Sequence, residues 1–116
     1  VGHTGDFSAV VAAVETVDRQ LHRVLKACFA AESHVLITAD HGNADNMGTT
    51  ETPHTAHTTN PVPFVYLSPQ DDDGDRAVRP NGSLCDIAPT ILRLMTLAPP
   101  SEMTGRSLLV QTESTG

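Results

Sequence analysis

The sequence predicts an α/β fold with mostly parallel strands, of which this chain holds only a part. Segments with apolar residues every three or four positions lie near both ends of the chain, and two short apolar runs lie between them. The resulting order is helix, strand, long loop, strand, loop and helix. Because two short strands do not make a stable sheet, we expect either further strands outside this chain or exposed sheet edges.

Composition excludes several classes of protein. The chain has 116 residues, of which 39% are hydrophobic and 3% aromatic, with a net charge of −7. An acidic chain without aromatic platforms is a poor candidate for binding nucleic acid. No apolar run approaches the roughly 18 residues of a membrane span. The two cysteines, Cys28 and Cys85, are too few for a disulfide framework, so we expect free, buried thiols and a cytoplasmic protein.

The first predicted helix runs from about Asp6 to Cys28. Its apolar residues share one stripe, which is typical of a helix packed on a core. Thr4 and Asp6 are both candidate N-caps. Cys28 falls on the stripe and is therefore expected in the core. The stripe contains Val10, Val14, Val17, Leu21, Val24, Leu25 and Cys28.

The two predicted strands are short. The first, residues 34–39, is mostly branched and apolar, which suits a strand covered on both faces. The second spans residues 62–67. It contains Pro63, which lacks an N–H and therefore fits the start of the strand or an edge position.

The last predicted helix runs from about Leu84 to Thr96. Ser83 and Asp86 have the spacing of a capping box, with Asp replacing the usual Glu or Gln. Pro89 then falls in the first turn, where its missing N–H costs little. The apolar tail at 103–109 is expected to dock on the fold.

Two segments are predicted to be exposed. Residues 68–83 include an acidic run, which predicts a solvated loop. A calcium loop of the EF-hand type does not fit, because prolines would occupy its first and last ligand positions. Residues 110–116 are expected to fray.

The six histidines fall into two groups. His22 and His34 are expected to be structural. Asp40 and His41, by contrast, directly follow the first strand, and the carboxyl ends of strands in open α/β sheets are where ligands bind. A carboxylate beside an imidazole could bind a divalent ion there, although an ordinary turn or helix cap would also explain the pair.

Three more histidines strengthen the metal interpretation. His54 and His57 lie in the loop before the second strand, and His3 precedes the first helix. Mixed carboxylate and imidazole ligands suit manganese or zinc rather than calcium. A two-metal site needs about twice the ligands that these residues could supply, so any such site is incomplete within this chain.

Three strings of sequence resemble one known family. They are residues 1–5 (VGHTG), 36–45 (LITADHGNAD) and 53–63 (PHTAHTTNPVP). In the same order they resemble the C-terminal part of the phosphatase domain of cofactor-independent (2,3-bisphosphoglycerate-independent) phosphoglycerate mutases, in the alkaline phosphatase superfamily. The strings at 86–90 and 102–105 are similar to that family too.

The resemblance implies a fold, a reaction and a set of ligands. The fold would be part of a three-layer sandwich like that of alkaline phosphatase. The family interconverts 3-phosphoglycerate and 2-phosphoglycerate in glycolysis through a phosphoserine, using two divalent ions. By resemblance, His3 and His57 would bind one ion, Asp40 and His41 the other, and His54 would support them. Mn²⁺ is expected, with Zn²⁺, Co²⁺ or Mg²⁺ as alternatives.

The departures from the family pattern limit the expected activity. The serine nucleophile, two metal-binding aspartates and the substrate-binding arginines of the family have no counterpart among residues 1–116. No catalytic residue or substrate contact can therefore be assigned here, and we expect the chain alone to be inactive.

Three other functions stay open. The chain could instead be a metal-binding interaction module on the same scaffold, a related metal-dependent phosphatase, or a phosphopentomutase.

The resemblance also implies the partners of the intact enzyme. The intact enzyme is expected to be a cytoplasmic monomer that binds phosphoglycerate, without nucleic acid or membrane partners.

Overall fold

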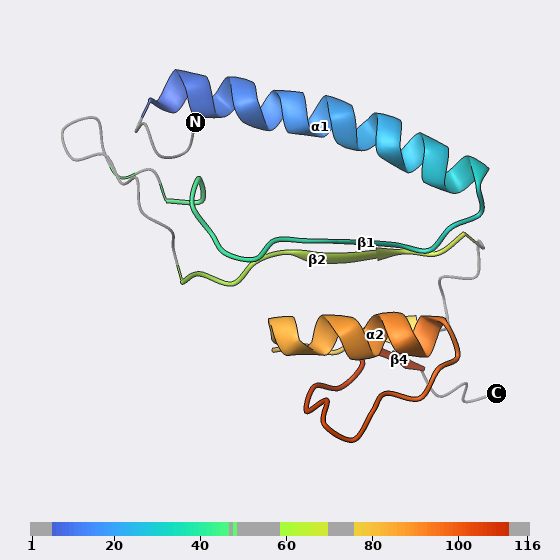
Figure 1. Ribbon diagram of the computed structural model, residues 1–116. Coiled ribbons are helices and arrows are strands. Elements are labelled where there is room, and N and C mark those ends of the chain that lie inside the picture. The colour runs from blue at the N-terminus through green and yellow to red at the C-terminus, as the bar shows by residue number, and fades with distance from the viewer. Residues whose placement is uncertain (1–5, 47, 49–58, 70–75, 112–116) are drawn as a thin grey trace. The chain divides into compact units, whose positions relative to one another are not determined.

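A computed structural model of the chain describes residues 6–46, 48, 59–69 and 76–111. The chain divides into two compact units, residues 1–69 and 70–116, which are treated separately below. The first unit contains helix α1 and strands β1 and β2, and the second contains strands β3 and β4 and helices η2 and α2 (Figure 1). Within the described ranges, none of the helices has the length and apolar character required to traverse a lipid bilayer.

Helix α1 spans Phe7–Ala30, two residues beyond the predicted end. Asp6 is its N-cap, since its side chain accepts a hydrogen bond from the N–H of Ala9 at 3.2 Å. At the other end Glu32 has a left-handed backbone, and the N–H of Ser33 donates to the carbonyl of Cys28 at 2.9 Å. This is a Schellman motif, which satisfies carbonyls that the helix leaves without partners.

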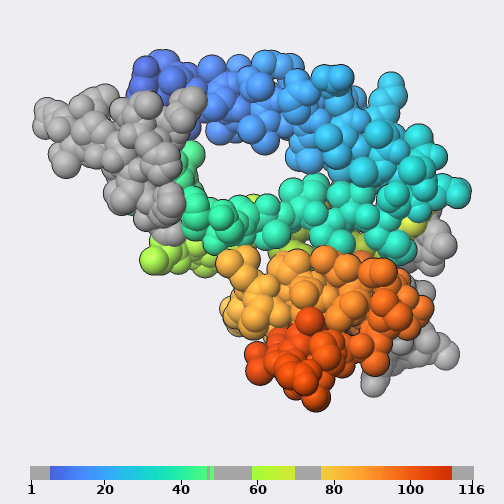
Figure 2. Space-filling view, in the orientation of Figure 1, coloured from blue at the N-terminus to red at the C-terminus, as the bar shows by residue number. Residues whose placement is uncertain are grey.

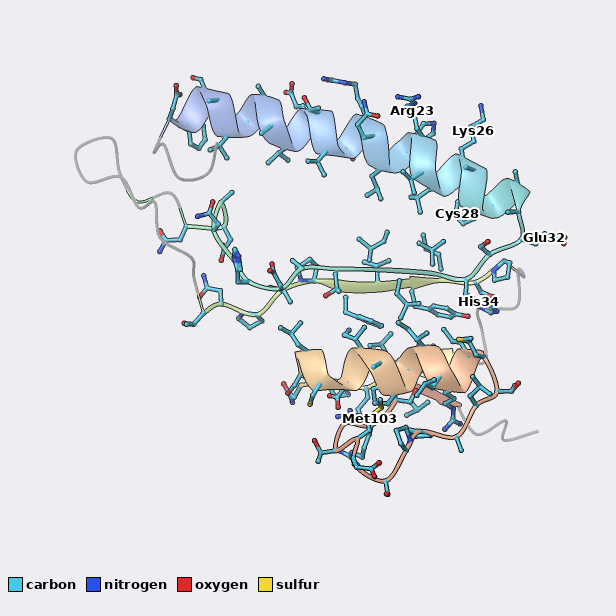
Figure 3. All side chains as sticks on the ribbon, viewed as in Figure 1. Arg23, Lys26, Cys28, Glu32, His34 and Met103 are labelled. Carbon is cyan, nitrogen blue, oxygen red and sulfur yellow. The ribbon has the colours of Figure 1, made fainter. Side chains whose placement is uncertain are left out.

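The predicted apolar stripe of α1 is present but largely uncovered. Val10 is buried, whereas Val14, Val17 and Val24 are exposed. Cys28 lies on the same stripe, and its thiol is only half-buried. The prediction that Cys28 is buried in a core is therefore wrong. Figure 3 shows Cys28 on the side of α1 opposite to Arg23 and Lys26, as an amphipathic helix requires.

Strands β1 (Val35–Thr38) and β2 (Phe64–Leu67) lie side by side (Figure 1). They are antiparallel, with Val35 opposite Leu67 and Thr38 opposite Phe64. The prediction of parallel strands is wrong for this pair. The reason is that the long loop after β1 returns to the end of β1 that it left, so β2 runs back along its neighbour. Strand β1 is also only half-buried, not covered on both faces.

The β1–β2 pair, a two-stranded ladder, has a side-chain contact between its strands at each end. At the end where β1 finishes, the Thr38 hydroxyl donates to the Pro63 carbonyl at 2.8 Å. At the opposite end the rings of His34 and Tyr66 stack, and His34 Nδ1 lies 2.7 Å from the Tyr66 hydroxyl. His34 therefore has a structural contact, as the sequence predicted.

The second unit contains the predicted C-terminal helix in two parts. A 3₁₀ turn, η2 (Leu84–Asp86), leads into α2 (Ile87–Leu94), and Pro89 lies buried in the first turn of α2. Thr96 is left-handed just beyond α2, and the N–H of Leu97 donates to the carbonyl of Leu92 at 2.8 Å. This is a second Schellman motif.

Two strands of the second unit were not predicted. Strand β3 (Arg76–Val78) pairs antiparallel with β4 (Leu109–Gln111). The exposed loop predicted for residues 68–83 is therefore interrupted by a strand, and residues 110 and 111 are paired rather than frayed. The acidic positions 71–75 and the tail 112–116 lie outside the described residues. The prediction that the 103–109 tail docks is confirmed by burial of Leu108 and Leu109.

The carboxylate of Asp86 connects several segments of the second unit. Its carboxylate accepts hydrogen bonds from the N–H of Ser83 and the N–H of Arg106, both at 2.8 Å, and pairs with Arg79 at 3.1 Å. The contact with Ser83 fulfils part of the predicted capping box. Gly105 lets the chain approach this closely, since a Cβ there would meet the Cys85 carbonyl oxygen at 2.0 Å. Cys85 itself is exposed, contrary to expectation.

Thr90 joins α2 to the tail. It is fully buried, and its hydroxyl donates to the Asp86 carbonyl at 2.7 Å while accepting from the N–H of Leu108 at 2.8 Å. Figure 2 shows the atoms of α2 in direct contact with those of the segment leading into β4. A single hydroxyl therefore bridges two segments that are distant in the sequence.

Replacing Thr90 with Val is expected to lower the free energy of unfolding by about 1–3 kcal/mol, because the buried N–H of Leu108 loses its acceptor. Chemical denaturation of the full chain measures this change. Thr90→Ser is the matched control, since it keeps the hydroxyl and both hydrogen bonds. A Val variant as stable as the Ser variant would show that the hydroxyl bridge contributes nothing.

Candidate metal site

The candidate site lies where β1 ends and β2 begins. Asp40 and His41 follow β1 directly, and the antiparallel register brings the start of β2 to the same end of the ladder. We call this region, residues 39–46 together with 59–63, the strand-end site. Thr38 is hydrogen-bonded to Pro63, so the two chain segments that border the site are held together.

The imidazole of His41 is oriented by the backbone of the next residue, Gly42. Its Nδ1 lies 3.1 Å from the carbonyl oxygen of Gly42. When Nδ1 donates its proton to that carbonyl, the lone pair is on Nε2, which is the tautomer that a metal-binding histidine needs. The side chain of His41 is 38% exposed and that of Asp40 is 85% exposed.

The carboxylate and the imidazole are spaced as two ligands of one cation would be. His41 Nε2 lies 3.6 Å from Asp40 Oδ1. Metal–ligand bonds of about 2.0–2.2 Å place two donors on a tetrahedral or octahedral ion about 3.0–3.6 Å apart. One oxygen and one nitrogen donor at this distance therefore fit a divalent ion such as Mn²⁺ or Zn²⁺.

A second link ties the two segments of the strand-end site together. Asn60 Nδ2 donates to Asp45 Oδ2 at 2.6 Å. Asp45 lies four residues beyond His41, and Asn60 lies in the segment that returns to β2. The sequence reasoning missed this pair. The signal that could have suggested it is the Asn60–Pro61 step, which is typical of a turn.

The structure thus brings together only part of the predicted ligand set. Asp40 and His41 lie side by side, while His3, His54 and His57 are outside the described residues. Among the residues that are described, no third His, Cys, Asp or Glu joins a cluster able to hold a metal ion. Two protein ligands are fewer than the three or four that a catalytic ion usually has.

Among the described residues, the titratable group whose pKa is clearly shifted lies outside the strand-end site. The N–H groups of Arg106 and Ser83 lower the pKa of Asp86 to about 2, with a further contribution from Arg79. All three partners belong to the same unit, and the hydrogen bonds close the fold around η2. Asp86 therefore has a structural role, although perturbed pKa values often mark active sites.

Comparison with known proteins agrees with the sequence resemblance. A family model described as Metalloenzyme superfamily matches residues 1–99. The chain is 59% identical over 109 residues to the 2,3-bisphosphoglycerate-independent phosphoglycerate mutase of Haloquadratum walsbyi and 60% identical over 109 residues to that of Haloarcula marismortui. It is 54% identical over 114 residues to the mutase of Thermomicrobium roseum.

These alignments cover nearly all of this chain but little of each relative. They include 94–95% of this chain and 21–22% of the relatives. This chain therefore spans about a fifth of the length of these enzymes, as a fragment of one would. Since the family model matches most of its residues, the chain belongs to the metalloenzyme superfamily.

Proposed function

We propose that this chain supplies part of the two-metal site of a phosphoglycerate mutase that interconverts 3-phosphoglycerate and 2-phosphoglycerate. Asp40 and His41 would bind one divalent ion, and His3 and His57 the other. His54 would support this ligand set. We propose Mn²⁺ as the metal and a glycolytic role in the cytoplasm.

One observation carries most of this proposal. The antiparallel register of β1 and β2 returns the loop to the end of β1, where Asp40 Oδ1 and His41 Nε2 are 3.6 Å apart. The sequence places His57 two positions before Thr59, where the described chain resumes at this same end. Ligands from both sides of the loop can therefore converge on neighbouring ions.

In the proposed enzyme, the residues of this chain would hold the divalent ions, and they would not themselves form or break bonds to the phosphoryl group. In the proposed reaction, a serine oxygen outside residues 1–116 displaces the 3-oxygen of phosphoglycerate at phosphorus. The 2-oxygen of the bound glycerate then displaces the serine. Bound divalent ions would neutralise the phosphoryl charge and lower the pKa of the attacking hydroxyl. The Gly42 carbonyl would keep the His41 ring in its ligating tautomer.

A hybrid enzyme tests this function. In it, the present chain replaces the matched segment of the Haloarcula marismortui mutase, to which it is 60% identical. We expect Mn²⁺-dependent conversion of 3-phosphoglycerate to 2-phosphoglycerate by the hybrid, and none by the chain alone, because the chain alone lacks the nucleophile. Turnover by the isolated chain, or a folded hybrid without activity, would overturn the proposal.

The alternatives make different predictions. A metal-binding interaction module would bind Mn²⁺ tightly and stoichiometrically as the isolated chain, without turnover in the hybrid. A metal-dependent phosphatase would release inorganic phosphate, and a phosphopentomutase would act on pentose phosphates. The three relatives compared above are all phosphoglycerate mutases, which favours the phosphoglycerate reaction.

A further inference from the structure

Two side-chain contacts join the return segment, residues 59–63, to the segment that carries the proposed ligands. The hydroxyl of Thr38 donates to the Pro63 carbonyl at 2.8 Å. Further along the chain, Asn60 Nδ2 donates to Asp45 Oδ2 at 2.6 Å. The two proposed ligands at positions 40 and 41 lie between residues 38 and 45 in the sequence, so their stretch of chain is anchored at both ends to the same neighbour.

The second of these contacts lies beyond the β1–β2 ladder. Thr38 is the last residue of β1 and is paired with Phe64, so its contact with Pro63 continues the ladder. Asp45 and Asn60 belong to neither strand. The ladder therefore does not hold the two segments together at this point, and the hydrogen bond between these two side chains joins them there.

A compact turn connects Asp45 to the imidazole of His41. The N–H of Asn46 donates to the carbonyl of Asn43 at 3.2 Å, which closes the turn around Asp45. Gly42 precedes this turn, and its carbonyl oxygen lies 3.1 Å from His41 Nδ1. A hydrogen bond at Asp45 therefore fixes the chain close to the carbonyl group that orients the proposed ligand.

The chemistry of the pair favours orientation over packing. Both side chains are exposed, so they cover no core. The acceptor is a carboxylate, and hydrogen bonds to a charged acceptor are about twice as strong as those between neutral groups. Such a bond can hold a turn in place even where water competes, whereas its loss leaves the core of the fold untouched.

We propose that Asp45 and Asn60 are positioning residues for the divalent-ion site. Their hydrogen bond holds the turn after β1, and with it Asp40 and His41, in the arrangement that binds the ion, and neither side chain of the pair contacts the ion itself. This inference rests on the proposed function through its metal site. Ordering a loose chain on binding costs free energy that would otherwise appear as affinity, so preordered ligands bind the ion more tightly.

Exchanging the donor and the acceptor tests the pair in the hybrid enzyme. Asn60→Asp places a second carboxylate opposite Asp45, and we expect the dissociation constant of Mn²⁺ to rise about tenfold. Adding Asp45→Asn restores a donor and an acceptor with their positions exchanged, so the affinity should return to within about threefold of the unsubstituted hybrid. Calorimetric titration with Mn²⁺ alone measures each value. Simple attraction of the cation predicts the opposite order, since Asn60→Asp adds a negative charge and Asp45→Asn removes one.

Gln20→Glu is the matched control for the added charge. Gln20 is exposed on α1, and glutamate keeps the side-chain oxygen that accepts from Arg23, so the Mn²⁺ affinity should not change. Asn60→Ala removes the donor without adding a charge and is expected to weaken Mn²⁺ binding in the same direction as Asn60→Asp. Thermal unfolding without metal should give the Asn60→Asp and Gln20→Glu hybrids similar Tm values, because a positioning role does not stabilise the core.

Three results would overturn the inference. One is an Asn60→Asp hybrid that binds Mn²⁺ as tightly as the Gln20→Glu hybrid. Another is a double variant that binds no better than Asn60→Asp, which would indicate that Asp45 is itself a metal ligand. The last is a Tm that falls together with the Mn²⁺ affinity, which would indicate a structural role only.

The two readouts separate this inference from the proposed function. Lost and recovered Mn²⁺ affinity in a hybrid without mutase activity would support the positioning pair and overturn the function. An active hybrid whose Mn²⁺ affinity is indifferent to both substitutions would overturn the inference alone. A folded hybrid that binds no Mn²⁺ would overturn both.

Discussion

Replacing Asp40 with Asn in the hybrid enzyme is expected to lower the Mn²⁺-dependent kcat/KM at least about 100-fold. The amide has the size and shape of the carboxylate but no negative charge, so it holds a divalent ion weakly. Loss of a residue that merely orients a metal ligand typically costs about 10–100-fold. Loss of a ligand should therefore cost more.

The control for this prediction is Asp18→Asn. Asp18 is an exposed acid on α1, so this change removes the same charge away from the strand-end site. Steady-state rates measured across a range of Mn²⁺ concentrations distinguish weaker metal binding, which excess Mn²⁺ partly restores, from unfolding, which it does not. An Asp40→Asn hybrid as active as the Asp18→Asn hybrid would remove Asp40 from the proposed ligand set.

The helices were the most predictable elements, because side-chain periodicity reports directly on a helix. The sequence located α1 and α2 with errors of only a few residues. It missed the C-terminal ends of both helices by two residues, since Glu32 and Thr96 adopt left-handed conformations that usually favour glycine. Hydrogen bonds back to the last turns of the helices stabilise these ends, and neither residue type predicts such a turn.

Strand direction was less predictable, because it depends on where a loop returns. The loop between β1 and β2 is long enough for either direction, and the residues of β2 are compatible with both. The parallel prediction rested on a preference of α/β folds and was wrong for the described pairs. Strands β3 and β4 are only three residues each, too short for an alternating pattern to show.

The candidate site was partly predictable for a similar reason. Asp40 and His41 follow an apolar strand directly, so their position at a strand end could be inferred from local sequence. The contact of Asn60 with Asp45 joins residues separated by a long loop, and only the folded loop shows it. The positions predicted for His3, His54 and His57 stay predictions.

Lowering the pH is expected to destabilise the second unit through Asp86. The pKa of Asp86 is about 2 in the folded chain, against an ordinary value of 3.8. A carboxylate with a lowered folded pKa stabilises the fold above its unfolded pKa, and this contribution is lost as the pH falls through the folded pKa. The Asp86 contribution should therefore be constant above about pH 5 and disappear between about pH 4 and pH 2.

Asp86→Asn tests this dependence without a large change in side-chain volume. The amide can still accept one backbone hydrogen bond, but it has no charge to pair with Arg79 and no proton to gain in acid. Denaturation of the full chain at several pH values should show lower stability of the variant near pH 7 and a smaller difference from the unsubstituted chain near pH 2. Asp18→Asn should keep the acid loss of the unsubstituted chain. An equal acid loss in Asp86→Asn would mean that other carboxylates, rather than the hydrogen-bonded Asp86, set the acid limit of this fold.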